Sequence, residues 1–151
     1  MDYIKGPKPD ECIFCSKVEE EDDEANLIVH RGEDCFVILN AYPYTNGHAM
    51  VAPFAHVPSI EQLGEPALLE MMTLTRRVLT GLREVYGPEG FNIGINQGKV
   101  AGAGVEDHIH MHTVPRWGAD TNFMPVIAST RVLPQSLEDS YRALRQSGSF
   151  S

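Results

Sequence analysis

The sequence predicts an α+β fold, in which five short β-strands combine with one long helix and a shorter helix near the C-terminal end. Two hydrophobic patterns support this prediction. Short apolar or alternating runs are typical of strands, and one segment of about 20 residues has apolar positions that recur every three to four residues, as in a helix. The chain has 151 residues, of which 42% are hydrophobic and 22% are charged. These values are typical of one globular domain.

Five segments have the composition of β-strands. The first two are separated by residues 31–34, Arg-Gly-Glu-Asp, which are typical of a hairpin turn. Residues 40–47 are rich in turn-forming residues and precede the third segment. In the fourth, Phe91, Ile93 and Ile95 alternate with small polar residues, so we expect one apolar and one polar face. The predicted strands, which begin as an antiparallel meander, are residues 27–30, 35–39, 48–53, 91–96 and 107–115.

Between residues 65 and 86 the apolar residues follow a helical period. The predicted helix begins near Pro66, since proline is favoured in a first turn, and it ends before Gly87 and Pro88. A shorter helix is predicted over residues 136–146, with Ser136 as its N-cap. The apolar positions that define the long helix are Leu68, Met72, Leu79, Leu82 and Tyr86.

The charge balance excludes several functions. Lys and Arg number 12 against 21 Asp and Glu, which gives a formal net charge of −9, and no cluster of basic residues of the kind that binds nucleic-acid polymers is present. No apolar segment approaches the roughly 20 residues that span a bilayer, and residues 1–10 lack the apolar core of a signal peptide. We therefore expect a cytoplasmic protein without nucleic-acid or membrane partners, which holds any anionic ligand through local donors.

The three cysteines cannot form a complete set of disulfides, which fits a reducing compartment. Cys35 lies in an apolar run and is expected to be a small buried residue. Cys12-Ile-Phe-Cys15 forms a CxxC motif, which by itself fits a zinc site, a redox turn or a pair of buried thiols. The acidic run at residues 19–24 is expected to be a solvated loop.

The clearest chemical signal is the run His108-Ile-His110-Met-His112, because half of the six histidines lie in these five residues. In a strand all three imidazoles project from one face, and neighbouring ones start about 6.6 Å apart. Unrelated surface histidines and a metal-binding triplet are alternatives, but no carboxylate cluster accompanies them to form an open catalytic metal site.

One neutral imidazole can attack an electrophile while a protonated neighbour stabilises charge or donates a proton. Phosphorus suits this chemistry, and backbone N–H groups of the glycine-containing loop at residues 98–104 could approach phosphate oxygens.

The segment His108-Ile-His110-Met-His112-Thr-Val resembles the His-φ-His-φ-His-φ-φ signature of the histidine triad (HIT) superfamily of nucleotide hydrolases and transferases. Thr113 is polar where an apolar residue is usual. The resemblance implies a HIT-like α+β fold, which is a five-stranded antiparallel sheet with one long helix and a C-terminal helical segment. It also implies a homodimer formed through the long helix and an edge strand. The likeness covers roughly residues 12–117 and extends to residues 36–40, 47–53, 96–98 and 115–116.

The same resemblance implies roles for individual residues. His110 would be the covalent nucleophile that takes up a nucleoside monophosphate, and His112 would contact the α-phosphate and assist the leaving group. His48 would support the nucleophile, although a single histidine after a glycine is more often structural. Asn40 would hydrogen-bond the ribose hydroxyls, and Asn96 would hold the phosphate side of the substrate.

One position departs from the family. Gly104 stands where many members have Ser or Thr in contact with the scissile region, which leaves the backbone N–H groups of Gly104 and Val105 as candidate donors. Within a single HIT domain over residues 1–151, we expect an N-terminal arm (1–26), a catalytic core (27–117) and a C-terminal segment (118–151).

The family resemblance also strengthens the zinc interpretation of the CxxC motif. Some branches, and the related galactose-1-phosphate uridylyltransferases, close a Cys₂His₂ site with a histidine after the third strand and the first histidine of the triad. Here these ligands are Cys12, Cys15, His56 and His108. A closed tetrahedral site leaves no position for substrate, so we expect a structural Zn²⁺ that ties the N-terminal arm to the sheet, and no organic cofactor.

The segment at residues 115–123 resembles the bacterial diadenosine tetraphosphate phosphorylase-like branch of the superfamily. This resemblance implies cleavage of dinucleoside polyphosphates, small-molecule nucleotide substrates, through a nucleotidyl-His110 intermediate by phosphorolysis or hydrolysis. The alternatives are a nucleoside phosphoramidase and a non-catalytic nucleotide-binding interaction module. Trp117 and Phe123 are expected either to form an apolar or stacking surface beside the phosphate site or to pack the C-terminal segment.

Overall fold

The computed structural model describes residues 12–118 and 135–150 of the chain. Its centre is a five-stranded sheet in the order β1-β2-β3-β5-β4, in which every neighbouring pair is antiparallel. This confirms the predicted fold class. The strands are β1 (Ile28–Arg31), β2 (Cys35–Leu39), β3 (Ala49–Pro53), β4 (Gly90–Ile95) and β5 (Met111–Arg116).

The strand order departs from the chain order at one place. β1, β2 and β3 form the predicted meander, but after β3 the chain crosses to the far edge of the sheet, forms β4 there, and returns as β5 between β4 and β3. In the resulting ladders His112 of β5 lies opposite Met50 of β3 and opposite Gly94 of β4. His112 therefore lies on an interior strand, with a neighbouring strand on each side.

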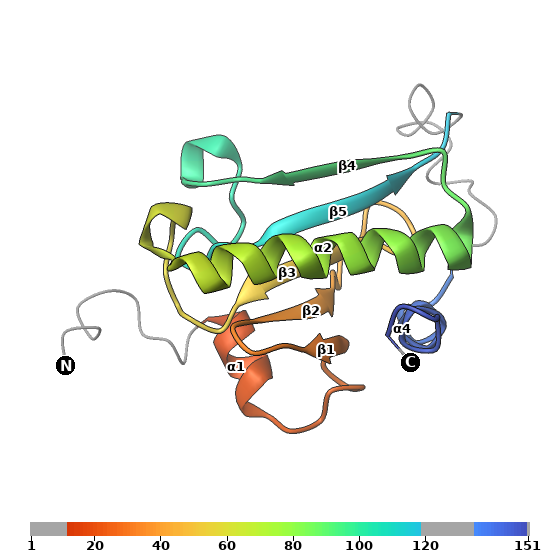
Figure 1. The fold of residues 1–151 in the computed structure, drawn as a ribbon, viewed down its shortest axis with the longest axis horizontal. Coiled ribbons are helices and arrows are strands. Elements are labelled where there is room, and N and C mark those ends of the chain that lie inside the picture. The colour runs from red at the N-terminus through yellow and green to blue at the C-terminus, as the bar shows by residue number, and fades with distance from the viewer. Residues whose placement is uncertain (1–11, 119–134, 151) are drawn as a thin grey trace.

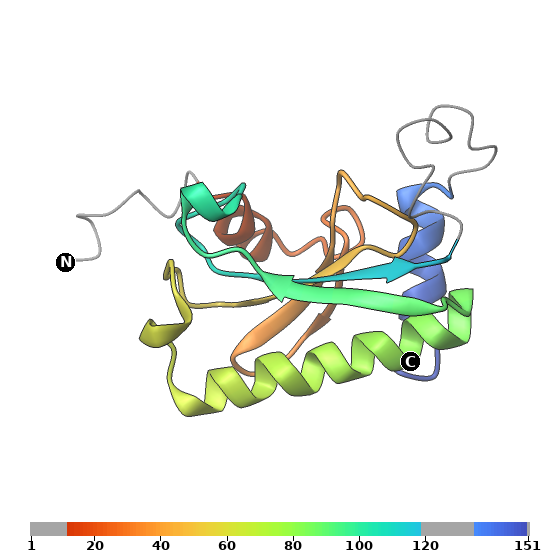
Figure 2. The ribbon, with the colours of Figure 1, turned by 90° about the horizontal axis from the view of Figure 1, so that it is seen from above.

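Helix α2 (Glu65–Tyr86) lies along one face of the sheet, while the short helix α1 (Ile13–Glu19) lies on the other side (Figures 1 and 2). The bounds predicted for the long helix are confirmed, and Gly87 ends it in the left-handed region at φ 58°. The predicted apolar face was partly wrong: Leu82 is buried, but Met72 is 55% exposed. The core also covers Met71, Leu74 and Val78, which follow the same three-to-four-residue period from a neighbouring starting position, while Leu68 and Tyr86 of the predicted face pack at its edge.

Helix α1 was not predicted, because the sequence interpretation treated residues 1–26 as an arm. Seven residues are too few for a helical period to be recognised. Phe14 in this helix is 1% exposed and packs against Phe36 of β2, so the CxxC segment belongs to the hydrophobic core. Glu19, the first residue of the predicted acidic loop, ends α1, and residues 20–24 form the loop, in which Asp23 makes an ion pair with Arg31 at 2.9 Å.

Helix α4 (Leu137–Arg145) confirms the predicted C-terminal helix, since the Ser136 hydroxyl accepts a hydrogen bond from the Asp139 N–H. It packs against β1 and α2. Two 3-10 turns, η3 (Ile60–Gln62) and η4 (Lys99–Ala101), lie in the connections on either side of α2 and β4. In the described ranges, no helix is long and apolar enough to cross a membrane.

The fifth strand begins later than predicted, at Met111 rather than at residue 107. The ladder with β3 ends at Val51↔Met111, and beyond it the N–H of Ile109 donates to the carbonyl of Val57 at 2.7 Å. His108 and His110 therefore lie on irregular backbone just before the strand. Ile109 is buried and Met111 packs against the core, as the alternation predicted.

Candidate functional site

Three imidazoles form a connected cluster beside the start of β5. His48 immediately precedes β3, His112 lies in β5, and His110 immediately precedes β5. Nε2 of His48 lies 3.0 Å from Nδ1 of His112, and the rings of His110 and His112 are 4.8 Å apart at an angle of 68°. His48 and His110 are 1% and 5% exposed, so the cluster is largely shielded from water. The structure thus brings together the three residues predicted to be catalytic.

The hydrogen bonds determine which nitrogen of each ring carries its proton. The backbone N–H of Tyr44 donates to Nδ1 of His48 at 3.2 Å, so His48 carries its proton on Nε2 and donates it to Nδ1 of His112. His112 must then carry its own proton on Nε2. In His110, Nδ1 lies 2.9 Å from the carbonyl oxygen of His108 and donates to it. A lone pair therefore remains on Nε2 of His110, beside a ring whose Nε2 is a donor.

Burial keeps these rings neutral. It lowers the pKa of His48 to about 4, with further effects of His112 and His110, and it lowers the pKa of His112 to about 4 with a further effect of His110. The pKa of His110 is also lowered by burial, although the contact with the His108 carbonyl opposes this. At neutral pH His110 is a neutral imidazole, which is the form that can attack an electrophile. The neighbour is therefore a neutral N–H donor, not the protonated imidazole considered from the sequence.

His108 does not share a ligand with the other two histidines, which corrects the expectation that all three imidazoles face one site. Its chain segment has left the strand, and its Nδ1 lies 3.3 Å from Sγ of Cys12 and 3.3 Å from Nδ1 of His56. Its main-chain carbonyl, by contrast, holds His110. One residue thus contributes its ring to one cluster and its backbone to the other.

The second cluster is the predicted metal-binding set. One ligand atom from each of four residues lies within 4.8 Å of all the others, and the four are Cys12, Cys15, His56 and His108. Zinc bonds of about 2.05 Å to nitrogen and 2.3 Å to sulfur at tetrahedral angles separate two nitrogens by about 3.3 Å and a nitrogen from a sulfur by about 3.5 Å. The structure has 3.3 Å between the two Nδ1 atoms and 3.3 to 3.6 Å between nitrogen and sulfur. The spacing fits a tetrahedral zinc ion.

The surroundings of this cluster also fit a metal. Nε2 of His108 donates to the carbonyl of Pro53 at 2.8 Å, which directs the lone pair of Nδ1 into the cluster. His56 lacks such an orienting contact among the described residues, where its Nε2 is buried without a hydrogen-bond partner. Without a metal, burial and the neighbouring Cys12 raise the pKa of the Cys15 thiol to about 12, so the thiolate form needs the positive charge of a bound cation. Two thiolates and two imidazoles are the donor set of closed, structural zinc sites.

Phe14 connects the two clusters, and the sequence interpretation did not assign it a role. Its ring lies 5.1 Å from the ring of His108 and 4.9 Å from the ring of His110. It stands between the two cysteines of the CxxC motif, so this motif contacts a histidine of each cluster. A large apolar residue between two candidate metal-ligating cysteines is the sequence pattern that could have identified Phe14.

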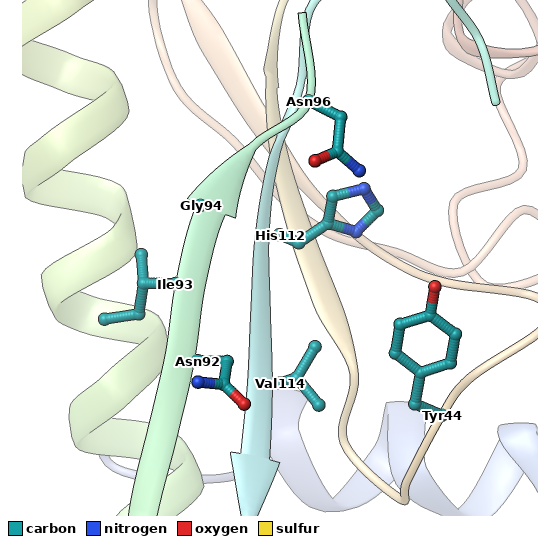
Figure 3. Close-up of a pocket in the computed structure, with 7 residues that line it drawn as sticks. All are labelled: Tyr44, Asn92, Ile93, Gly94, Asn96, His112 and Val114. Carbon is teal, nitrogen blue, oxygen red and sulfur yellow. The ribbon is translucent and has the colours of Figure 1, made fainter. Parts of the chain in front are cut away.

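His112 also lines a pocket at the surface of the sheet (Figure 3). Its volume is about 200 Å³, and it is open to solvent. In Figure 3 the side chains of Asn92, His112 and Val114 lie on one side of the β4–β5 ladder, whereas Ile93 points toward the helix. The residues that line it are Tyr44, Asn92, Ile93, Gly94, Asn96, His112 and Val114. The small polar face predicted for residues 91–96 is thus the floor of this pocket.

The predicted substrate-binding residues have different surroundings. Asn40 accepts from the N–H of Tyr42 at 2.8 Å, a turn contact, while its amide nitrogen lies 3.4 Å from Nε2 of His48. Asn96 lines the pocket. Gly104 is exposed and Val105 half-buried in the loop between η4 and β5. Of the proposed stacking pair, Trp117 is half-buried, and Phe123 lies outside the described residues.

The sheet topology and the buried histidine cluster define the class of protein to which this chain belongs. A model of the HIT domain matches residues 21–118, and the chain is a member of that family. Two relatives named AP-4-A phosphorylase, from two strains of Mycobacterium tuberculosis, are 40% identical over 129 residues, which is 85% of this chain and 66% of each relative. The chain thus spans slightly less than two thirds of the length of these relatives.

Other members of the family share smaller parts of the sequence or the fold. The adenylylsulfatase HINT3 of Arabidopsis thaliana is 27% identical over 106 residues, which is 70% of this chain and 52% of the relative. The crystal structure of a zinc-bound histidine triad family protein from Mycobacterium smegmatis superposes with a TM-score of 0.72 and 29% identity, covering 91% of this chain and 93% of that one. The predicted family membership is confirmed.

Proposed function

We propose that the protein cleaves dinucleoside polyphosphates by transferring a nucleoside monophosphate to Nε2 of His110 and then to phosphate or water. The observation that supports this most directly is the pair of neighbouring rings in which His110 offers a lone pair and His112 offers an N–H group. The 40% identity to the proteins named AP-4-A phosphorylase supports the substrate class.

In the first step Nε2 of His110 attacks the α-phosphorus, a P–N bond forms, and the bond from phosphorus to the bridging oxygen breaks. The carbonyl of His108 stabilises the positive charge that develops on the ring through its hydrogen bond with Nδ1–H. The N–H of His112 stabilises the oxygen that departs with the electron pair, and it keeps its proton because a nucleoside polyphosphate leaves as an anion. His48 fixes the orientation of His112 for this contact.

In the second step an oxygen of phosphate or water attacks the same phosphorus, the P–N bond breaks, and the electron pair returns to Nε2 of His110. The proton of the attacking group is released to solvent. With phosphate as acceptor, diadenosine tetraphosphate yields ADP and ATP, and with water it yields AMP and ATP. Asn40 is proposed to hold the ribose hydroxyls of the retained nucleotide, Asn96 the phosphate side of the substrate, and the backbone N–H groups of Gly104 and Val105 the scissile region.

The test is to incubate the protein with diadenosine tetraphosphate, with and without inorganic phosphate, and to identify the products. Mass spectrometry of quenched protein should show a nucleotidyl adduct on His110. His110→Ala should abolish turnover and adduct, while His30→Gln, at a histidine of β1 outside both clusters, should keep both. Full activity of His110→Ala would exclude this chemistry. Cleavage of a nucleoside phosphoramidate without cleavage of the dinucleotide would indicate a phosphoramidase, and nucleotide binding without turnover would indicate a binding module.

We propose that Cys12, Cys15, His56 and His108 hold a structural zinc ion, which the tetrahedral spacing of their ligand atoms supports. Bound zinc would fix the start of α1 against the segment that carries His108 and His110, and it would leave no coordination position for substrate. The three cysteines, all free thiols, support a reducing compartment such as the cytoplasm.

We further propose a homodimer. Leu69 and Met72 on α2 and Ile93 on the edge strand β4 are 66%, 55% and 46% exposed, and they give this side of the molecule an apolar character. A second copy that covers these residues would remove them from water. Sedimentation at micromolar concentration should show a dimer, and Met72→Glu should shift it toward the monomer.

A further inference from the structure

The glycine that lies opposite His112 leaves the floor of the pocket open. Gly94 of β4 pairs with His112 of β5, and a Cβ atom placed on Gly94 would meet no protein atom within 4 Å. Its backbone is in the ordinary strand region, so the fold does not require glycine here. The absent side chain instead leaves space directly beside the imidazole that is proposed to contact the leaving group.

The order of groups across the site indicates which part of a substrate would use that space. His110 contacts both Phe14 and His112, and of these three residues only His112 lines the pocket. Attack at phosphorus places the attacking atom and the departing oxygen roughly in line on opposite sides. A group that leaves from a phosphorus held between His110 and His112 therefore moves away from His110, toward the pocket.

We propose that this pocket binds the departing nucleoside polyphosphate in the first step and inorganic phosphate in the second. The inference rests on the proposed function and goes beyond it, because it assigns the acceptor and the leaving group to a site separate from that of the retained nucleotide. The two ligands share one site because the acceptor attacks along the line on which the leaving group departed. The chemistry is the second step described above: an oxygen of the phosphate in the pocket forms a P–O bond as the P–N bond to His110 breaks.

The polar groups of the pocket suit the phosphate chain of such a ligand. Asn92 and Asn96 contribute amide groups, and the hydroxyl of Tyr44 points toward the space beside His112 (Figure 3). Arg116 donates to the Oδ1 atom of Asn92 and brings a positive charge to the outer end of this face. In a chain with a net charge of −9, such local donors are what can hold an anion.

Gly94 permits a sharp test, because a side chain added there meets the ligand and no protein atom at its Cβ. Gly94→Ala and Gly94→Val should progressively fill the pocket, and Gly90→Ala and Gly90→Val are matched controls. Gly90 lies on the same strand, its Cβ would also meet nothing within 4 Å, and it does not line the pocket. Circular dichroism and sedimentation should show the same fold and assembly for all four variants.

The expected result for Gly94→Val is a fall of about tenfold or more in kcat/KM for diadenosine tetraphosphate and a similar rise in the KM for phosphate, with unchanged affinity for AMP. Gly94→Ala should change in the same direction by less, and the Gly90 variants should match the wild type. If Gly94→Val is as active as Gly90→Val, or if it weakens AMP binding equally, the pocket is not the leaving-group site. If the wild type forms no nucleotidyl-His110, the proposed function itself fails, and the inference fails with it.

Discussion

Replacing Phe14 by leucine should reduce turnover while leaving substrate binding intact. Phe14 is 1% exposed, and its ring contacts the rings of His108 and His110 at 5.1 and 4.9 Å. Leucine retains most of the apolar burial but removes the aromatic ring that contacts the His110 imidazole at an interplanar angle of 50°. We therefore expect Phe14 to act as a positioning residue, which restricts the ring to the orientation in which Nε2 can attack.

The magnitude follows from the contacts that are lost. Each aromatic pair contributes about 0.5 to 1.5 kcal/mol beyond burial. If about 1 kcal/mol of this favours the attacking orientation of His110, its loss lowers kcat about fivefold. The remaining lost contacts lower the free energy of unfolding by about 1 to 3 kcal/mol, which at this chain length corresponds to a Tm lower by about 3 to 10 °C.

The assay compares Phe14→Leu with Phe36→Leu. Phe36 is also fully buried and packs against Phe14 and Phe54, so its truncation costs stability from the same region of the core. Steady-state rates with diadenosine tetraphosphate should be measured well below both melting temperatures, together with the zinc content of each variant. Phe14→Leu should lower kcat with an unchanged KM and zinc content, whereas Phe36→Leu should lower Tm alone.

Equal kcat values for the two variants would refute the positioning role and leave Phe14 as a core residue. A fall in kcat that accompanies loss of zinc would also refute it, because the effect would then come from the metal cluster.

Three further predictions concern the other parts of the site. Elemental analysis of the purified protein should find about one zinc per chain. Cys15→Ser should lose the zinc and melt at a lower temperature. Cys35→Ser, at a buried thiol outside the metal-binding cluster, should keep the zinc. Asn40→Ala should weaken ribonucleotide binding by roughly one order of magnitude and 2′-deoxyribonucleotide binding by less; equal weakening with a lower Tm would assign Asn40 to the turn that its contact with Tyr42 closes. Thermal stability should rise with pH between about 4 and about 6.5. His48 and His112 have a pKa of about 4 in the folded chain and about 6.5 in the unfolded chain. The unfolded chain therefore binds more protons in this range, and raising the pH favours the folded chain. His48→Gln should flatten this dependence in melting curves recorded across the range, and an unchanged slope would contradict the assignment.

The sequence alone was sufficient for features that depend on neighbours along the chain. The long helix, the Ser136 cap, the first hairpin and five strands were all predicted, because periodicity and turn residues act within a few positions. The histidine run and the CxxC motif identified residues of both side-chain clusters, and the family resemblance assigned His56 to the cluster that contains the cysteines. These are short patterns in which residue type and spacing carry the chemistry.

The tertiary structure decided what depends on contacts between distant segments. The face of α2 that is buried, the start of β5 at Met111 and the insertion of β5 between β3 and β4 follow from how separate elements pack together. The same holds for the proton positions on His48 and His112, which a backbone N–H from the β2–β3 connection determines. Periodicity shows which side chains share a face, but the element that covers that face is selected by the summed burial and hydrogen bonding of the whole chain. The family resemblance gave His108, His110 and His112 different roles, but only the folded chain shows that the ring of His108 lies with Cys12 and His56 while the rings of His110 and His112 lie together.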